Sequence, residues 1–384
     1  MAETVSGLFP EIEDDAGSRP QHSTGILPYQ ALKEMVRARE IRAADDIAER
    51  QFQPASIDLR LGACAYRVRA SFLPSEGATV EEKIRDLGMH EIDLTGGAVL
   101  EKGCVYIVRL IEMLALTSRI SGIANPKSST GRLDVFTRLI TDGSVEFDRV
   151  RSGYKGALYA EISPRTFSIL VRKHSRLNQL RLRRGSPPAS DTALRRLHAE
   201  TPLVHSEGGE ANISGGIAVT VDLEGRESGG LIGYKARKHS DVIDVDRIGH
   251  YPPLDFWEPI HARKDKRLIL DPDTFHILAS KEPVTVPPDH AAEMAAYDPL
   301  VGEFRVHYAG FFDPGFGYSE SGGAGSRAVL EVRSHEVPFL IEDGQVVGRL
   351  LYERLTETPD RLYGADLGSS YQRQGLALSK QFKR

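Results

Sequence analysis

The chain has 384 residues, of which 40% are hydrophobic and 27% are charged, with a formal net charge of −5. This composition is typical of a globular protein, and the length allows two domains with separate cores. The acidic balance argues against general binding to nucleic acid, which needs a net basic surface. Because the sequence has no apolar run near 18 residues and no signal-peptide core, we expect a cytoplasmic protein that does not cross a membrane.

The sequence predicts a flexible polar leader up to residue 26 and ordered structure from about residue 27. Residues 1–26 are rich in Glu, Asp, Gly and Ser, which predicts a flexible leader. Pro28 can begin a helix, and Leu32, Met35 and Val36 recur at helical spacing, so a short helix is expected over about 29–39. Three later runs read as strands between turn residues, so the first half is expected to be mostly β; they are 56–61, 104–108 and 167–171.

The sequence contains a long internal repeat. Residues 100–108, advanced by 170 positions, fall on residues 270–278, and Glu161 falls on Glu331. A repeat of this length indicates a duplicated domain rather than a solenoid. The expected parts are a first domain at 27–185, a linker at 186–214 with a helix around 193–199, a second domain at 215–358 and a C-terminal segment at 359–384.

The run Lys127-Ser128-Ser129-Thr130-Gly131-Arg132 concentrates donors for an anion. It offers two cations and three hydroxyls directly after Pro126, which suits a polyphosphate. It is not a P-loop, because Pro126 stands where that motif needs a Gly and has no N–H to offer. Taken alone, the run also fits a surface turn. The matching place in the second copy presents Asp298 and Glu303, so we expect phosphate binding only in the first copy.

Several motifs in order resemble those of the dCTP deaminase family, within the superfamily that it shares with trimeric dUTPase. The motifs are 54–62, the run at 127–132, 313–316, 329–331 and 363–376, and the resemblance covers about residues 27–380, including a longer, two-copy form of the family. It implies a mainly β fold made of two tandem dUTPase-like distorted jelly-roll β-barrels with a few short helices. It also implies a homo-oligomer, a trimer-like assembly of repeats, in which the first copy presents the phosphate run to the base pocket of the second.

The resemblance assigns roles to individual residues. Glu331 matches the catalytic Glu of the family, and Ser128 and Arg132 match residues that bracket the attacking water. Ser370 stands where the family commonly has Lys, which puts one phosphate contact in question. The positions that match substrate-binding residues are Lys127, Ser129, Thr130 and Gly131 on the phosphate side, Asp313, Val329 and Leu330 at the base pocket, and Tyr363 and Gln374 in the C-terminal segment, which is expected to be a mobile lid.

The implied reaction replaces the amino group at C4 of cytosine by oxygen, and one carboxylate can take the proton from water and return it to ammonia. Zinc deaminases instead use a His-x-Glu motif with a Cys pair. The chain has His205-Ser206-Glu207 but only Cys64 and Cys104, far apart, so we expect no protein-bound zinc and two buried thiols. Mg²⁺ is expected to arrive on the nucleotide triphosphate. An outward-facing strand Glu is the alternative for Glu331.

Other interpretations stay open at this stage. Glu161, after Gly153-Tyr154-Lys155-Gly156, is a second candidate base, and the basic run 172–184 predicts a strand with a solvated or subunit-facing cationic side. The expected activity is deamination of dCTP to dUTP, which would supply thymidylate synthesis, with dTTP as a possible feedback inhibitor. The alternatives are a bifunctional dCTP deaminase and dUTP pyrophosphatase, and a non-catalytic nucleotide sensor.

Overall fold

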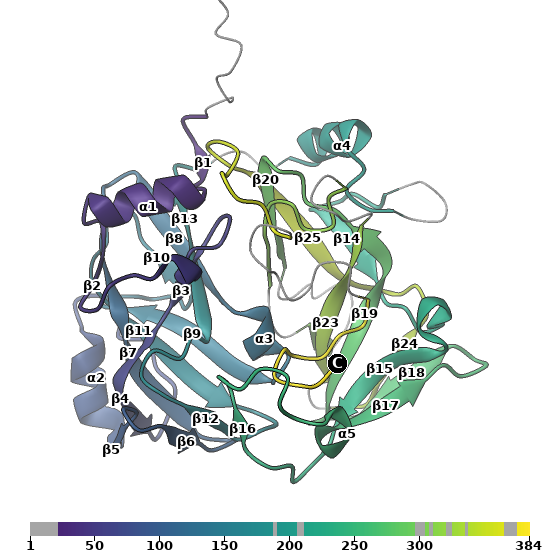
Figure 1. Ribbon diagram of the computed structural model, residues 1–384, viewed down its shortest axis with the longest axis horizontal. Helices are drawn as coiled ribbons and strands as arrows, with labels where there is room; N and C mark the ends of the chain where they lie inside the picture. Colours follow the sequence, from purple (N-terminus) through teal and green to yellow (C-terminus); the bar gives the residue numbers. More distant parts are fainter. Residues whose placement is uncertain are drawn as a thin grey trace, which may run out of the picture.

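The computed structural model describes residues 22–186, 190–205, 211–295, 304–306, 310–319, 325–334, 337–364 and 375–384. These residues form two β-rich lobes that lie side by side, the first in purple and blue and the second in green and yellow (Figure 1). The prediction of a mainly β fold in two copies is therefore confirmed.

The first lobe contains two main sheets and one small sheet among the described residues. The first main sheet has the order β1-β13-β8-β10, with β3 also paired to β13, and the second has the order β5-β4-β7-β11-β9, with β2 paired to β7. The bounds are β1 Gly25–Ile26, β2 Ile41–Ala43, β3 Ile57–Leu59, β4 Leu61–Val68, β5 Gly88–Asp93, β7 Val105–Ala115, β8 Ile120–Pro126, β9 Val135–Thr141, β10 Arg149–Val150, β11 Lys155–Pro164 and β13 Asn178–Arg184. The small sheet pairs β6 (Ala98–Leu100) with β12 (Ile169–Val171).

The second lobe repeats this plan. Its sheets have the orders β14-β25-β20-β22, β17-β15-β19-β23-β21 and β18-β24. The bounds are β14 Ile217–Thr220, β15 Leu231–Ala236, β17 Trp257–His261, β18 Arg267–Leu270, β19 Phe275–Val284, β20 His290–Met294, β21 Phe304–Val306, β22 Phe311–Phe312, β23 Ser326–Ser334, β24 Phe339–Glu342 and β25 Val346–Arg354.

The strand register confirms the internal repeat. Glu161 on β11 lies opposite Ile107 on β7, and Glu331 on β23 lies opposite Ile277 on β19. Both pairs differ by the same shift that relates the two halves of the sequence. The two glutamates therefore occupy equivalent positions in the two lobes.

The helices are few and short, as expected. They are α1 Tyr29–Arg37, α2 Val80–Leu87, α3 Ser128–Gly131, α4 Asp191–Glu200 and α5 Pro253–Phe256, with single 3₁₀ turns at Glu49–Gln51 and Arg226–Ser228. α1 buries Leu32 and Met35, the residues whose spacing predicted it, and α4 covers the segment predicted as a helix around 193–199. Its Leu194 and Leu197 are packed against the core of the second lobe.

Two predictions about the connecting segments need correction. The leader predicted at 1–26 is ordered at its end, because Gly25 and Ile26 pair with β13 as strand β1 and Ile26 is buried. The segment predicted as a linker, 186–214, contributes Leu203 and Val204 to the core of the second lobe. Apolar residues in a segment rich in turn formers were sufficient to hold it against the lobe.

The two lobes share a core at their boundary. Strand β16 (Ile243–Asp244) of the second half pairs in parallel with β12 of the first, Ile169 lying opposite Ile243. The ring of Phe167 lies 5.4 Å from that of Trp257 in an edge-on arrangement. Because this contact is continuous with the first hydrophobic core, the lobes are held in one relative position.

The C-terminal end is packed against this boundary, as the yellow segment in Figure 1 shows. Phe382 is only 3% exposed and lies among the rings of Tyr251, Phe256 and Trp257. Burying a side chain of this size stabilises the fold by about 2 kcal/mol. Within residues 363–380, the part of the lid segment that was expected to be mobile, residues 375–380 are packed, through Leu376, Leu378 and the buried Ser379.

Candidate active site

The predicted phosphate run folds as a single helical turn at the lobe boundary. Pro126 ends β8, and α3 follows with Lys127 as its N-cap and Arg132 as its C-cap. Leu133 and Val135 behind it are buried, which anchors the turn to the first lobe. Ser128 and Arg132 are four residues apart, so they share one face of the turn.

Asp134 fixes the end of this turn against the second lobe. Its φ of 55° is left-handed, a conformation that Asp tolerates better than most residues. Its carboxylate forms an ion pair with Arg333 on β23 and accepts a hydrogen bond from Thr166. Arg333 also donates to the Thr166 hydroxyl at 3.0 Å. This contact places α3 beside the strand that carries Glu331.

Glu331 points out of its own lobe but is buried by the other. On β23, Ala328, Leu330 and Val332 lie in the core of the second lobe, so the alternating residues Val329 and Glu331 face the first lobe. Val329 packs against the first core, and Glu331 is 6% exposed. The alternative of a solvent-facing strand Glu is wrong. The side chain of Leu330, predicted near the base, lies on the core face instead.

Arg132 and Glu331 meet across the boundary. The Nε atom of Arg132 lies 3.8 Å from Oε1 of Glu331, and both side chains are almost fully buried. Burial raises the pKa of Glu331 to about 7, while the Arg132 guanidinium acts in the opposite direction. A carboxyl group with this pKa can exchange a proton near neutral pH, which is what a general base that later serves as an acid needs.

This pKa gives a prediction for pH dependence. Catalysis that needs ionised Glu331 should decline about tenfold per pH unit below about pH 7. The raised pKa has the opposite effect on stability, which decreases as the pH rises. The folded state keeps this proton between the ordinary carboxyl pKa of 4.5 and about 7, so its stabilising effect is lost as pH rises through that window. The melting temperature of wild type should therefore fall relative to Glu331→Gln between pH 5 and pH 8. A constant difference would contradict the raised pKa.

The residues that were predicted to face phosphate lie on α3 and at its N-cap. Ser129, Thr130 and Gly131 are buried on α3, and Ser128 is half-buried. Lys127 forms an ion pair with the buried carboxylate of Asp58, whose other oxygen lies 3.2 Å from Arg176. Asp58 belongs to the motif at 54–62, but the sequence did not assign it a role.

Asp313 lies on the same boundary, paired with a residue that the sequence analysis missed. Its Oδ1 is 3.2 Å from Nη2 of Arg181 on β13, and both side chains are buried. Burial raises the pKa of Asp313, opposed by Arg181. Of the two alternatives for the run 172–184, a solvated or a subunit-facing cationic side, the solvated one is wrong for Arg181, which faces the second lobe. Tyr363 lies close by, donating its backbone N–H to the carbonyl of Pro314 at 2.8 Å.

Glu161, the second candidate base, has a different partner. It is 1% exposed and lies 3.1 Å from Nε of Arg138, which sits directly opposite on the neighbouring strand β9. The guanidinium of Arg138 is in turn stacked on Phe147, 3.5 Å from the ring centroid. The first lobe therefore neutralises its own Glu with an Arg from the same sheet, whereas Glu331 receives its Arg from the other lobe.

The remaining predictions concern Gln374, metal binding, membrane spans and the two cysteines. Gln374 lies outside the described residues. Within the described part of the chain, no group of three or more His, Cys, Asp or Glu side chains could hold a metal ion. None of the helices described is long and apolar enough to cross a membrane. Cys64 and Cys104 are free and only half-buried, so the expectation of buried thiols holds in part.

Fold and site together define a two-lobed β protein with a buried Arg–Glu pair between its repeats. Family models match both halves: the 2′-deoxycytidine 5′-triphosphate deaminase (DCD) N-terminal domain over residues 23–186 and the DCD C-terminal domain over residues 190–382. The chain belongs to the 2′-deoxycytidine 5′-triphosphate deaminase family, whose members are hydrolases acting on carbon–nitrogen bonds.

Solved and curated relatives agree with this assignment. The crystal structure of 2′-deoxycytidine 5′-triphosphate deaminase from Agrobacterium tumefaciens is 55% identical, with a TM-score of 0.83, over 87% of this chain and 100% of that one. This similarity confirms the dUTPase-like fold. Two curated relatives are named "dCTP deaminase, dUMP-forming". The Halobacterium salinarum protein is 34% identical over 110 residues, 28% of this chain, and the Beutenbergia cavernae protein is 31% identical over 119 residues, 30% of this chain. The matches span 52% and 58% of those two relatives.

Proposed function

We propose that the chain deaminates dCTP: dCTP and water give dUTP and ammonia. The observation that carries the proposal is the Arg132–Glu331 pair, buried between the lobes, with a carboxyl pKa near neutrality. The family assignment names the substrate, and the residues of both repeats supply the groups that the reaction needs.

The reaction can be followed through one carboxylate. Glu331 takes a proton from water, and the resulting hydroxide attacks C4 of the cytosine ring to form a tetrahedral centre. The guanidinium of Arg132 and the hydroxyl of Ser128 stabilise the negative charge that develops on the attacking oxygen. The addition moves the electron pair of the C4=N3 double bond to N3, which receives the proton of the new C4 hydroxyl as the C4 carbonyl forms. Glu331 returns the proton that it took from water to the amino group, which leaves as ammonia. The carboxylate is regenerated, so atoms and charge balance over the cycle.

The rest of the nucleotide is held by the flanking residues. Lys127 and the α3 turn with Ser129 face the phosphates, and Mg²⁺ enters as part of the nucleotide substrate. Asp313 and Val329 lie on the side proposed for deoxyribose and base, and Tyr363 packs near them, its ring 5.6 Å from that of Phe316.

A second candidate is a bifunctional enzyme that also hydrolyses dUTP to dUMP and pyrophosphate. It is favoured by the printed names of the curated relatives, which describe dUMP-forming enzymes. The obvious residue for activating a second water is Asp313, but its carboxylate is engaged by Arg181. On this ground we propose dUTP as the released product.

The test is a product analysis. The purified protein, washed with a chelator, is incubated with dCTP and Mg²⁺, and ammonia, dUTP, dUMP and pyrophosphate are measured together. Ammonia with dUTP in equal amounts is the expected result. Ammonia with dUMP and pyrophosphate would establish the bifunctional enzyme. Nucleotide binding without ammonia would overturn the proposal in favour of a sensor.

A further inference from the structure

The guanidinium of Arg132 contacts two acceptors from distant parts of the chain. Its Nη1 atom donates to the backbone carbonyl of Ala377 at 3.1 Å, and its Nε atom lies 3.8 Å from Oε1 of Glu331. We propose that the C-terminal end, residues 375–384, is a positioning element that holds Arg132 beside the attacking water and keeps it from closing fully onto Glu331. This inference rests on the proposed function, in which both side chains act on that water.

The carbonyl that Arg132 uses is attached to the same helical turn as Arg132 itself. Two residues after Ala377, the buried hydroxyl of Ser379 donates to the backbone carbonyl of Ser129 on α3 at 2.7 Å. Because α3 ends at Arg132, its C-cap, the C-terminal segment and the guanidinium have a common support. The position of the Ala377 carbonyl is therefore fixed relative to the side chain that it receives.

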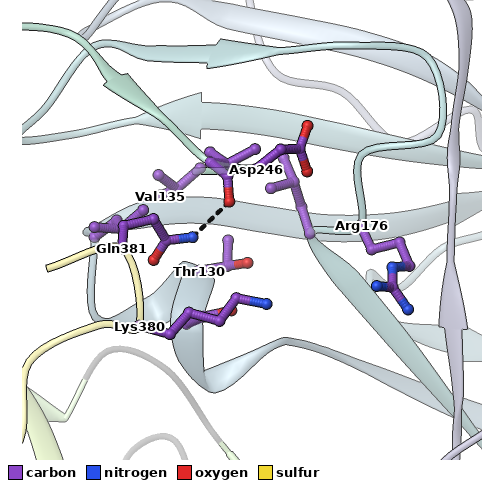
Figure 2. A pocket seen from close by; sticks show the side chains of 10 residues that line it. Thr130, Val135, Arg176, Asp246, Lys380 and Gln381 are labelled. Carbon is purple, nitrogen blue, oxygen red and sulfur yellow. Dashed lines mark hydrogen bonds between the residues drawn. The ribbon is translucent and has the colours of Figure 1, made fainter. Parts of the chain in front are cut away.

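Contacts with the second half of the chain hold the far side of this segment. The side-chain amide of Gln381 donates to the carbonyl of Val245 at 2.6 Å, the hydrogen bond that is dashed in Figure 2. Phe382 packs among aromatic rings at the lobe boundary, and the backbone N–H of Lys383 donates to the carbonyl of Tyr251 at 2.9 Å. The segment thus bridges α3 and the second half, and it restricts the movement of the group that holds Arg132.

The equivalent glutamate of the first lobe has a closer arginine. The Nε atom of Arg138 lies 3.1 Å from Oε1 of Glu161, and Nη2 of Arg138 donates to the same oxygen. The corresponding Nε distance at Glu331 is 3.8 Å, which is too long for a hydrogen bond. This difference between the two repeats indicates that the Ala377 carbonyl draws part of the Arg132 guanidinium away from the carboxylate.

The position of Arg132 matters because few other charges face Glu331. Among the described residues, the charge that acts on the pKa of Glu331 is that of Arg132, which lowers it against the effect of burial. Arg333, two residues along the same face of β23, is paired with Asp134, and the residue opposite Glu331 on β19 is apolar. A guanidinium that moved closer to Glu331 would therefore lower its pKa further.

Release of the C-terminal end should change the site in one direction. Arg132 would close onto Glu331 as Arg138 closes onto Glu161, and water entering beside the carboxylate would also favour its ionised form. The guanidinium would leave the place from which it stabilises the attacking oxygen. Turnover should become slower while the acid limb of the pH–rate profile moves to lower pH. Removal of the Arg132 charge itself would move that limb to higher pH, so the two effects are distinguishable.

The test is the double variant Ser379→Ala/Gln381→Ala, which removes two side-chain anchors and leaves Phe382 in place. We expect kcat for dCTP to fall about tenfold, because the oxyanion loses part of its stabilisation. The acid limb of kcat/KM should move to lower pH by about 1. Phe382→Ala should change both quantities in the same direction. Lys383→Met, at an exposed position of the same chain end, is the matched control and should leave both unchanged.

A titration without substrate makes the test independent of turnover. Glutamate carboxyl carbons are labelled with ¹³C, the Glu331 signal is assigned by its absence in Glu331→Gln, and its pKa is read from the chemical shift between pH 5 and pH 9. We expect about 7 in wild type and in Lys383→Met, and a lower pKa in Ser379→Ala/Gln381→Ala. The inference is overturned if the pKa of Glu331 stays at its wild-type value or rises in both the double variant and Phe382→Ala. Failure of the proposed function is a separate result, in which wild type releases no ammonia from dCTP.

Discussion

Glu331→Gln is expected to lower dCTP deamination by about a thousandfold, the middle of the range for loss of a general acid–base group. The amide keeps the size of the side chain and its place on β23, but it cannot accept a proton from water. Binding of dCTP should persist, because the phosphate side of the site is built by residues of the first lobe. Ammonia release and calorimetric binding of dCTP, measured on the same preparation, check both halves of this expectation.

The chain offers a matched control in Glu161, which occupies the equivalent position in the first lobe. Glu161→Gln removes a carboxylate that is paired with Arg138 within one sheet. We expect it to lower stability by about 1 kcal/mol, since the partly exposed guanidinium of Arg138 loses its ionised partner, while turnover per folded molecule stays near wild type. If Glu331→Gln kept the wild-type rate, or if Glu161→Gln were the inactive variant, the assignment of the base would be wrong.

Arg132→Met is expected to lower kcat by roughly 100-fold, because the developing oxyanion loses its guanidinium partner. The same change removes the charge that holds down the pKa of Glu331, so the acid limb of the pH–rate profile should move to higher pH. This shift is a signature that simple loss of packing would not produce. It is measured from kcat/KM between pH 5.5 and pH 9.

Arg138→Met provides the corresponding control in the first lobe. Arg138 has the same charge and is also paired with a Glu, with 3.1 Å between Nε and Oε1 instead of 3.8 Å, but it has no contact with the proposed base. Loss of the Arg138 side chain should lower the stability of the protein and leave the pH dependence of kcat/KM unchanged. An unchanged profile in Arg132→Met would mean that the first lobe does not contribute to the chemistry.

Much of the fold followed from local patterns and from the repeat. The shift of 170 residues that relates Glu161 to Glu331 in the sequence is also the shift between their partners Ile107 and Ile277 in the sheets. Alternation along β23 decided that Glu331 lies on the face opposite the core of its own lobe. Sequence alone did not decide whether that face is solvated, because burial there comes from the other lobe.

The features that the sequence missed depend on contacts between distant segments. The C-terminal segment is rich in Gly, Ser and Gln, which predicted mobility, but Phe382 packs against aromatic residues more than a hundred positions earlier. The alternating pattern of its strand predicts that Arg181 is a surface cation, but the structure pairs it with Asp313. One feature of the sequence could have indicated that Asp58 pairs with a cation. The motif that contains Asp58 has a looser counterpart around Asp222, and Asp222 forms an ion pair with Arg327.

The most direct test of the account is complementation between two inactive variants. The account places Arg132 and Glu331 of one chain in one site, so Arg132→Met and Glu331→Gln, co-expressed with different tags and purified through both, should show no more ammonia release than either variant alone. If the sites were shared between chains, some sites of the mixed assembly would contain both wild-type residues. Clear recovery of activity in the mixed assembly would contradict a site built by the two lobes of a single chain.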